Sequence, residues 1–308
     1  MEPESQIQAR GLTKRFGEFT AVDAIDFDVR RGEAFGFLGP NGAGKSSTMR
    51  MVGCVSPPSG GTLRVLDLDV VTDGAVIRGR LGVVPQEDTL DGDLSVRENL
   101  YIYARYFDLS RKQARAKAAE LLDFVQLTDR ADARVESLSG GMKRRLTIAR
   151  SLVNDPDVLL LDEPTTGLDP QARHLVWERL YLLKQQGVTL VLTTHYMDEA
   201  EQLCDRLVVM DAGRIVAAGS PRELITEHST REVLELRLAD ADRASIEARV
   251  DGLADRIETL PDRVLIYTAD GERTADVLHD RGLRPISLLV RRSTLEDVFL
   301  RLTGRALE

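Results

Sequence analysis

Gly39-Pro40-Asn41-Gly42-Ala43-Gly44-Lys45-Ser46 is the stretch that decides the fold of this 308-residue chain. Its three glycines allow backbone conformations that a side chain would forbid, so successive N–H groups can turn inward around phosphates. Lys45 supplies a positive charge for the β- and γ-phosphates, and the Ser46 hydroxyl is suited to Mg²⁺. The alternative is a glycine-rich turn with an incidental lysine, and the neighbouring motifs argue against it.

The segments that flank this loop fit a strand–loop–helix unit. The apolar run 34–38 ahead of it suits a buried parallel strand. The stretch 47–51 behind it can start a helix, whose N-terminus favours anions. Nucleotide binding is therefore assigned to the whole loop and the residue after it, namely Gly39, Pro40, Asn41, Gly42, Ala43, Gly44, Lys45, Ser46 and Ser47.

A pair of carboxylates follows a second buried strand. The run Val158-Leu159-Leu160-Leu161 is apolar throughout, and Asp162 and Glu163 emerge at its carboxyl end. In an open α/β sheet, ligands bind at that end of the strands. Asp162 is suited to hold Mg²⁺, and Glu163 to take a proton from an attacking water. Acidic pairs are common in loops, so this assignment depends on the phosphate loop.

Leu138-Ser139-Gly140-Gly141-Met142 resembles the signature sequence of the ATP-binding cassette (ABC) ATPases. The other marks of that family follow in order: the adenine-stacking aromatic (Phe16), the Q-loop glutamine (Gln86), the D-loop (Gly167-Leu168-Asp169-Pro170) and the switch histidine (His195). The resemblance covers residues 6 to about 225. It implies a phosphate-loop, RecA-like α/β core with an antiparallel β subdomain and a helical subdomain.

The resemblance also implies an ATP hydrolase with ATP and Mg²⁺ as cofactors. The catalytic residues carried over are Glu163, His195, Lys45 and Gln86, and the metal ligands are Ser46, Gln86 and Asp162. The nucleotide-binding residues outside the loop are Phe16, Ser139, Gly140, Gly141 and Asp169. In the family, the signature faces the nucleotide of the opposite subunit, which implies a homodimer or a pair with a homologue.

Four segments resemble one exporter branch: Val83-Val84-Pro85-Gln86, Val96 to Leu100, Gly140 to Leu146, and Thr194 to Glu201. That branch contains the ABC-2 ATPases of nodulation-factor export and of daunorubicin-type drug export. It implies efflux of a drug, lipid or glycolipid-like substrate through a separate transmembrane permease. The alternatives are an importer ATPase and, in a different class, an ABC protein of translation or DNA repair. The tail and the Met142 signature favour export over import, and the single cassette without long inserted arms argues against the other class.

Phe16 departs from the family pattern, in which Tyr is commoner. A phenyl ring keeps its π-face and can still stack on adenine, although the hydroxyl is lost. The alternative is that Phe16 is a buried core aromatic.

The composition limits the partners. A net charge of −9 argues against non-specific nucleic-acid binding, which needs a basic face. No apolar run approaches the ~18–20 residues of a membrane span, and the acidic start Met1 to Ser5 has no secretory pattern. We therefore expect a peripheral protein at the cytoplasmic face of the membrane, held there by the permease. Cys54 and Cys204 lack metal-ligand spacing and are expected to be buried thiols.

Two domains are expected, 6–225 for nucleotide binding and 231–308 as an accessory, regulatory domain. Residues 88–153 have helical periodicity, with Ser139 as an N-cap, and the Lys143-Arg144-Arg145 run is interpreted as a solvated helix face. Residues 220–230 are interpreted as a linker. The tail pattern predicts a β-α-β-α-β-α order, typical of a small ferredoxin-like α+β domain.

Overall fold

The computed structural model describes residues 4–239 and 246–304, which separate into two units. The first unit ends at Ala218 and the second begins at Gly219. The predicted acidic start (1–3) and the parts of the predicted tail at 240–245 and 305–308 lie outside the described residues.

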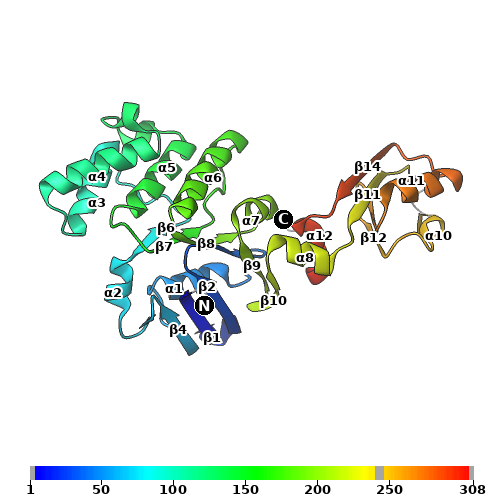
Figure 1. The fold of residues 1–308 in the computed structure, drawn as a ribbon, viewed down its shortest axis with the longest axis horizontal. Helices are drawn as coiled ribbons and strands as arrows, with labels where there is room; N and C mark the ends of the chain where they lie inside the picture. Colours follow the sequence, from blue (N-terminus) through cyan, green and yellow to red (C-terminus); the bar gives the residue numbers. More distant parts are fainter. Residues whose placement is uncertain (1–3, 240–245, 305–308) are drawn as a thin grey trace. The chain divides into compact units, whose positions relative to one another are not determined.

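A six-stranded sheet in the order β10-β9-β3-β8-β7-β6 lies at the centre of the first unit (Figure 1). Its strands are β3 (Ala34–Leu38), β6 (Leu81–Val84), β7 (Val158–Asp162), β8 (Thr189–Thr194), β9 (Arg206–Asp211) and β10 (Arg214–Gly219). The pairs from β9 to β6 are parallel, so their carboxyl ends share one edge. Every residue of β3 is buried, as its continuous apolar run predicts.

A four-stranded antiparallel sheet in the order β2-β1-β4-β5 lies at one end of the same unit. Its strands are β1 (Ser5–Phe16), β2 (Phe19–Arg30), β4 (Gly60–Val65) and β5 (Leu68–Asp69). Phe27 from this sheet packs against Phe35 and Phe37 of β3, with ring centroids 6.0 and 5.0 Å away. These rings join the two sheets into one hydrophobic core.

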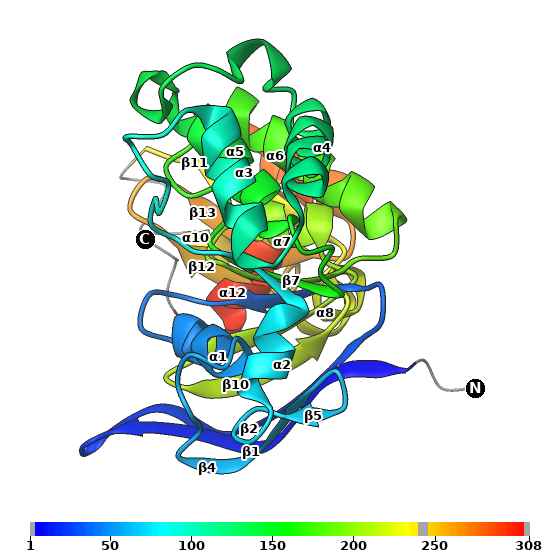
Figure 2. The same cartoon turned by 90° about the vertical axis from the view of Figure 1, so that its left-hand side faces the viewer.

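Helices occupy the opposite end of the first unit (Figure 2). There α3 (Val96–Tyr106), α4 (Arg111–Phe124) and α5 (Gly140–Ser151) pack together, with short 3₁₀ turns η1 (Thr128–Arg130) and η2 (Val135–Ser137). The remaining helices are α1 (Lys45–Val52), α2 (Gly74–Gly79), α6 (Pro170–Gln185) and α7 (Met197–Leu203). Ser95 and Ser110 begin α3 and α4 with capping boxes, and Ser139 caps α5 as predicted.

The Lys143-Arg144-Arg145 run is not the solvated helix face that the sequence predicts. Arg145 is only 9% exposed, and its guanidinium donates to Val125 O at 2.7 Å. Arg144 is partly buried and donates only to backbone carbonyls in the hydrogen bonds found among the described residues. The physical reason is that α5 packs against neighbours on several sides, and arginine can bury its stem while its N–H groups find acceptors.

The second unit contains a sheet in the order β12-β13-β11-β14. Its strands are β11 (Glu232–Arg237), β12 (Arg256–Thr259), β13 (Val264–Thr268) and β14 (Ser287–Arg292), and its helices are α8 (Pro221–His228), α10 (Ile246–Val250), α11 (Gly271–Asp280) and α12 (Leu295–Thr303). In the described residues from β11 to β14 the order is β-α-β-β-α-β, so the ferredoxin-like prediction is confirmed. The predicted element order was wrong because it omitted β12, in which Ile257 is the only apolar residue.

The segment 220–230 is a helix and not the predicted linker. Ser220 accepts from Glu223 N while Glu223 Oε2 accepts from Ser220 N, which makes a capping box. Pro221 occupies the first turn, where its missing N–H costs nothing. Leu224 is buried, and α8 packs against α12. The helix therefore belongs to the second unit.

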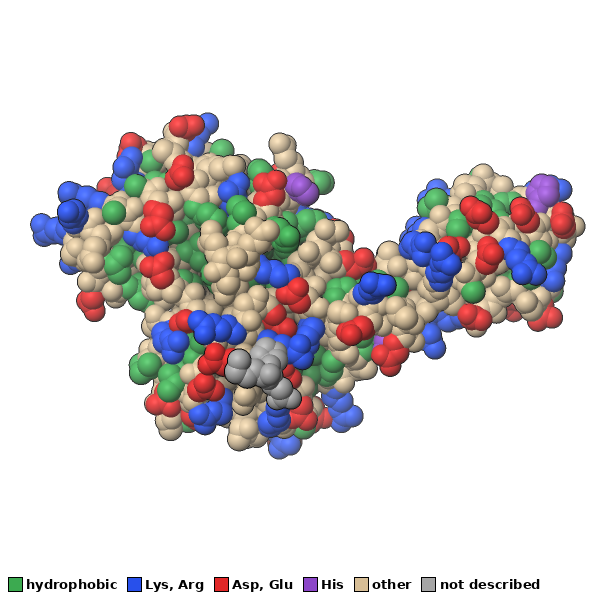
Figure 3. All heavy atoms as spheres, in the orientation of Figure 1, with side chains coloured by type: hydrophobic (Ala, Val, Ile, Leu, Met, Phe, Trp, Pro, Cys, Tyr) green, Lys and Arg blue, Asp and Glu red, His purple; other side chains and the backbone are tan. Residues whose placement is uncertain are grey.

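The surface of both units carries charges of both signs. On the face drawn in Figure 3, basic and acidic side chains are interspersed. Within residues 4–239 and 246–304, no helix is both long enough and apolar enough to cross a bilayer.

Candidate functional site

A cavity of about 390 Å³ opens where the phosphate loop meets the carboxyl ends of the core strands. It is lined by Phe19, Ala21, Asn41, Gly42, Gly44, Lys45, Ser46, Ser47, Gln86 and Glu163. All but Phe19 and Ala21 are predicted site residues. Segments more than a hundred positions apart in the sequence therefore meet in one site.

The loop adopts the positive-φ backbone conformations that its glycines predict. Gly42 and Gly44 have positive φ angles of 82° and 101°, a region that favours glycine. At Gly44 a Cβ atom would lie 2.5 Å from Ala21 O, so a side chain there would collide with β2. Helix α1 starts at Lys45, directly after this turn, and its N-terminus faces the cavity with N–H groups suited to phosphate.

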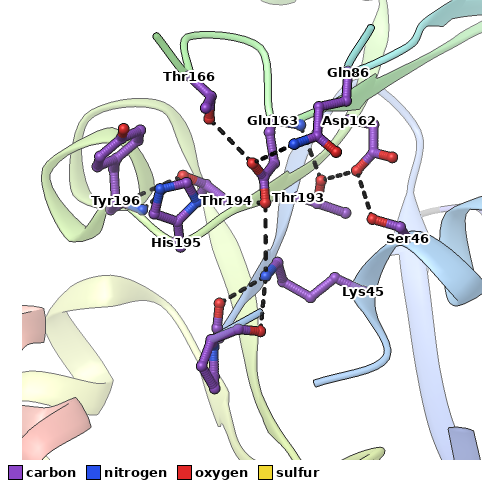
Figure 4. Close-up of polar contacts among 12 residues, drawn as sticks. Lys45, Ser46, Gln86, Asp162, Glu163, Thr166, Thr193, Thr194, His195 and Tyr196 are labelled. Carbon is purple, nitrogen blue, oxygen red and sulfur yellow. Dashed lines mark hydrogen bonds and ion pairs between the residues drawn. The ribbon is translucent and has the colours of Figure 1, made fainter. Parts of the chain in front are cut away.

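Lys45 provides a buried positive charge at the base of the cavity. Its side chain is 4% exposed, and Nζ donates to Gly39 O at 2.7 Å and to Pro40 O at 3.1 Å. Nζ also lies 3.9 Å from Glu163 Oε1 (Figure 4). Burial lowers the pKa of Lys45, while the charges of Glu163 and Asp162 oppose that shift.

Asp162 lies between the loop and the neighbouring strand β8. Its Oδ1 accepts from Thr193 Oγ1 at 2.5 Å and from Ser46 Oγ at 3.2 Å. Gln86 reaches the same region, and its Nε2 donates to Glu163 Oε2 at 3.2 Å. The Ser46 hydroxyl thus meets the Asp162 carboxylate, and Gln86 contacts the adjacent Glu163. Hydroxyl, carboxylate and amide oxygen atoms are the ligand type that Mg²⁺ prefers.

Glu163 occupies a strained position at the end of β7. Its φ is +46°, which is uncommon for a residue with a side chain. Its N–H donates to Thr193 Oγ1 at 3.0 Å, and Thr166 Oγ1 donates to its Oε2 at 3.1 Å. Its side chain is 6% exposed and points into the cavity between Lys45 and Gln86 (Figure 4).

His195 completes the group from the end of β8. Its Nδ1 lies 3.3 Å from Glu163 Oε1, but the geometry does not make a hydrogen bond, and this buried nitrogen has no hydrogen-bond partner among the described residues. The ring packs on Tyr196, with centroids 4.1 Å apart. The histidine is therefore held beside the carboxylate with a polar atom still available.

Other predicted site residues lie outside this cavity. In the described part of the chain, Ser139 and Asp169 cap α5 and α6 through Met142 N and Ala172 N, and neither lines the cavity. Gly140 and Gly141 begin α5 and are likewise not among the lining residues. A single chain therefore does not join its signature to its own phosphate loop.

The aromatic residues at the cavity differ from the prediction. Phe16 is 54% exposed, so the alternative of a buried core aromatic was wrong. Phe19, which is not among the predicted site residues, lines the cavity and pairs with Phe16 across the β1–β2 turn. The signal was present, since a Phe16-Gly17-Glu18-Phe19 turn brings two aromatic residues to one end of a hairpin.

Thr166 and Thr193, which donate to the carboxylates of Glu163 and Asp162, are also absent from the predicted site, because hydroxyl residues near strand ends carry no distinctive spacing.

The cysteines are free, with Cys204 buried and Cys54 only partly buried.

Two segments of the chain match described families. Residues 22–166 match the family described as ABC transporter. Residues 241–304 match the family described as nodulation factor export protein NodI, C-terminal domain.

Similar proteins cover nearly the whole chain. The Nod factor export ATP-binding protein I of Paraburkholderia xenovorans is 48% identical over 306 residues, which is 99% of each chain. The protein of the same name from Mesorhizobium japonicum is 48% identical over 97% of this chain and 86% of its own.

Solved structures resemble the first unit. A dimeric ATP-binding cassette in a post-hydrolysis state, bound to ADP and Pi, matches with a TM-score of 0.64 and 26% identity over 70% of this chain and 98% of its own. The cbiO1 protein of Clostridium perfringens, part of an ABC transporter complex, matches with a TM-score of 0.68 and 29% identity over 73% of this chain and 92% of its own. The chain therefore belongs to the ABC transporter family, as an ATP-hydrolysing subunit of the branch that contains the Nod factor export ATP-binding proteins.

Proposed function

We propose that this chain powers the export of an amphiphilic, glycolipid-like molecule through a separate membrane permease. The observation that carries this proposal is the 48% identity over 99% of both chains to a Nod factor export ATP-binding protein, which includes the C-terminal unit. Lipid and drug efflux are the broader classes within the same branch. The cargo path is assigned to the permease.

The chemistry proposed for the site is transfer of the γ-phosphoryl group of ATP to water. Lys45 and the loop N–H groups stabilise the charge on the phosphate oxygens, which is the main task in this reaction. Glu163 accepts the proton of the attacking water as a general base. His195 hydrogen-bonds the γ-phosphate and links it to Glu163, whose Oε1 lies 3.3 Å from His195 Nδ1. Phe16 or Phe19 stacks on the adenine.

The residues near Asp162 fit Mg²⁺. Ser46, Gln86 and Asp162 would hold it, since the Ser46 hydroxyl lies 3.2 Å from the Asp162 carboxylate and Gln86 lines the same cavity as Ser46. When bound, Mg²⁺ neutralises charge on the β- and γ-phosphate oxygens.

Two copies are proposed to share each nucleotide. The α5 N-terminus, with Ser139, Gly140 and Gly141, is an exposed anion site that does not reach the chain's own cavity. Contact with the nucleotide of a second subunit would use that site, with Asp169 of the D-loop near the interface. The γ-phosphate would then favour the closed pair over the open one.

The first unit, which ends at Ala218 and not at the expected residue 225, is proposed to bind the nucleotide, and the second unit to have an accessory, regulatory role. Attachment to a permease would keep the protein at the cytoplasmic face of the membrane. Nucleic acid is not among the proposed partners, in line with the net charge of −9.

Reconstitution with the permease tests the proposal. The chain and a co-expressed six-span permease are purified together and inserted into liposomes, and ATP-dependent movement of a fluorescent glycolipid is measured against a fluorescent cationic drug. We expect glycolipid transport and a rise in ATP turnover over that of the chain alone. Transport of the drug alone would contradict the substrate class, and equal turnover with and without the permease would contradict coupling.

A further inference from the structure

The Arg144 side chain on α5 donates hydrogen bonds to the backbone of two segments, the turn that carries Glu163 and the loop that carries Gln86. Its Nε donates to Pro164 O at 2.6 Å, and its Nη2 donates to Asp162 O at 3.0 Å and Glu163 O at 3.1 Å. Its Nη1 donates to Pro85 O, the residue before Gln86. The planar fork of an arginine can satisfy several acceptors in fixed directions, which a lysine cannot.

The turn that Arg144 holds is the strained one. Glu163 has a φ of +46°, and such a conformation persists only where its surroundings enforce it. Arg144 binds the carbonyls of Asp162, Glu163 and Pro164, so it holds the peptide groups on both sides of Glu163. Thr193 holds the N–H of Glu163 from the other side of the turn. Together these contacts fix the direction in which the Glu163 side chain leaves the backbone.

In the described residues, the Arg144 guanidinium donates its hydrogen bonds to the dipoles of backbone carbonyl groups and not to a carboxylate. Within residues 4–239 and 246–304, its hydrogen bonds all go to backbone carbonyls. Burial lowers its pKa to about 10, while Glu199, Asp162, Asp88 and Glu163 oppose that shift, so the group remains charged at neutral pH. Because its hydrogen bonds leave the Glu163 carboxylate untouched, that carboxylate is still able to accept a proton.

We infer that Arg144 is a positioning residue for ATP hydrolysis, which fixes the Glu163 turn and the Gln86 loop relative to each other and ties both to helix α5. This inference rests on the proposed roles of Glu163 and Gln86. Arg144 follows the signature by only two positions, so a displacement at the start of α5 is transmitted directly to the two catalytic segments. Arg144, which the sequence predicts to lie on a solvated helix face, therefore helps to position the active site.

Arg145 is a matched control in the same helix. It is also buried and also donates to carbonyls, Val125 O at 2.7 Å and Gln126 O at 3.4 Å. Those carbonyls follow α4 and belong to neither catalytic segment. A loss that arises from removing any buried arginine of α5 should appear in both variants, whereas a positioning effect should appear at Arg144 alone.

The test compares Arg144→Ala with Arg145→Ala in the full chain. For Arg144→Ala we expect faster backbone hydrogen exchange, without nucleotide, in peptides that span 84–90 and 161–168. We also expect kcat to fall roughly 10- to 100-fold, as for other residues that orient catalytic groups, with KM within about threefold of wild type. Guanidinium ion at low millimolar concentration should restore part of both effects. Arg145→Ala should change exchange near 120–127 and leave kcat near wild type.

The Lys variants at both positions cover the case in which an Ala variant fails to fold. Arg144→Lys should lie between wild type and Arg144→Ala, because an ammonium reaches fewer of the four carbonyls. Unchanged exchange at 84–90 and 161–168 in a folded Arg144 variant would overturn the inference, as would equal losses of kcat at the two arginines. The exchange result does not depend on Glu163 as the base. A fully active Glu163→Gln variant would therefore contradict the proposed function separately.

Discussion

Lys45 Nζ lies 3.9 Å from Glu163 Oε1, and both side chains are almost fully buried. The group that would bind phosphate and the group that would take the proton of water are thus neighbours of opposite charge. Lys45 also donates to two loop carbonyls, so its position does not depend on Glu163 alone. The phosphate-binding part of the site should therefore survive the loss of the carboxylate charge.

Glu163→Gln should retain ATP binding and lower hydrolysis by ~10²–10⁴-fold, the usual contribution of a general base. The amide keeps the shape of the side chain but cannot accept a proton. Steady-state hydrolysis at saturating ATP and Mg²⁺ and an equilibrium binding titration check the two parts. Glu178→Gln, at an exposed position on α6, is the control and should match wild type. Hydrolysis within threefold of wild type would remove Glu163 from this role.

Much of the first unit could be predicted from sequence because its signals are local and strong. The run 34–38 and the phosphate loop define a strand, a turn and a helix start, and the structure contains β3, the Gly42–Gly44 turn and α1 at those places. Strand topology then brings Asp162 and Glu163 to the same edge, as the parallel-sheet rule predicts.

The failures occurred where tertiary contacts override local pattern. A run of three basic residues on a helix normally faces water, and only the packing of α5 reveals that Arg144 and Arg145 find buried carbonyls. Ser220 and Glu223 have the spacing of a capping box, but the polar composition around them favoured a linker. Strand β12 pairs with β13 through its backbone and needs little apolar side-chain surface.

A chain that ends at Ala218 should bind nucleotide with near-normal affinity. The residues that line the phosphate cavity all precede Ala218, and the second unit begins at Gly219. The truncation removes the whole of α8, whereas a chain that ended at residue 225, the boundary predicted from the sequence, would be cut inside this helix. A binding titration of the truncated and the full chain checks this. A large loss of affinity in a truncated chain that folds would contradict the division, whereas reduced assembly with the permease would agree with it.

Asp297→Asn should destabilise the second unit by about 3 kcal/mol, the cost of breaking a buried ion pair. Asp297 is fully buried, and Arg291 donates to its two oxygens at 2.7 and 2.9 Å. Calorimetry of the full chain measures the effect. Trp177 is the only tryptophan and lies in the first unit, so its fluorescence should report an unchanged transition there. The exposed Asp276→Asn is the control.

The effect of Asp297 should also depend on pH. Burial would raise the pKa of Asp297, but the hydrogen bonds from Arg291 and Thr294 outweigh burial and hold the pKa below its usual 3.8. The unfolded chain therefore takes up this proton first on acidification. The stabilisation is present above about pH 4 and is lost as pH falls through the folded-state pKa. The difference between wild type and Asp297→Asn should be constant from pH 7 to 5 and shrink below pH 4. A difference that grows on acidification would contradict this assignment.

Lys45→Ala and Ser139→Arg should complement each other if each nucleotide lies between two chains. The first variant loses the charge of the phosphate cavity, and the second blocks the exposed start of α5. A mixed dimer has one site with both defects and one site with neither, whereas each variant alone has only defective sites. Mixing the two should therefore restore ATP-dependent dimerisation, measured by light scattering with Glu163→Gln in both chains to prevent turnover. Dimerisation is the better measurement, since hydrolysis could require two intact sites.

If the mixture scatters no more than the separate, folded variants, disulfide crosslinking between cysteines placed near Ser139 and Ser47 decides the cause. A crosslink between chains that carry neither defect would mean that the shared site exists and that one intact site cannot close the dimer, and the absence of a crosslink would mean that the shared site does not exist.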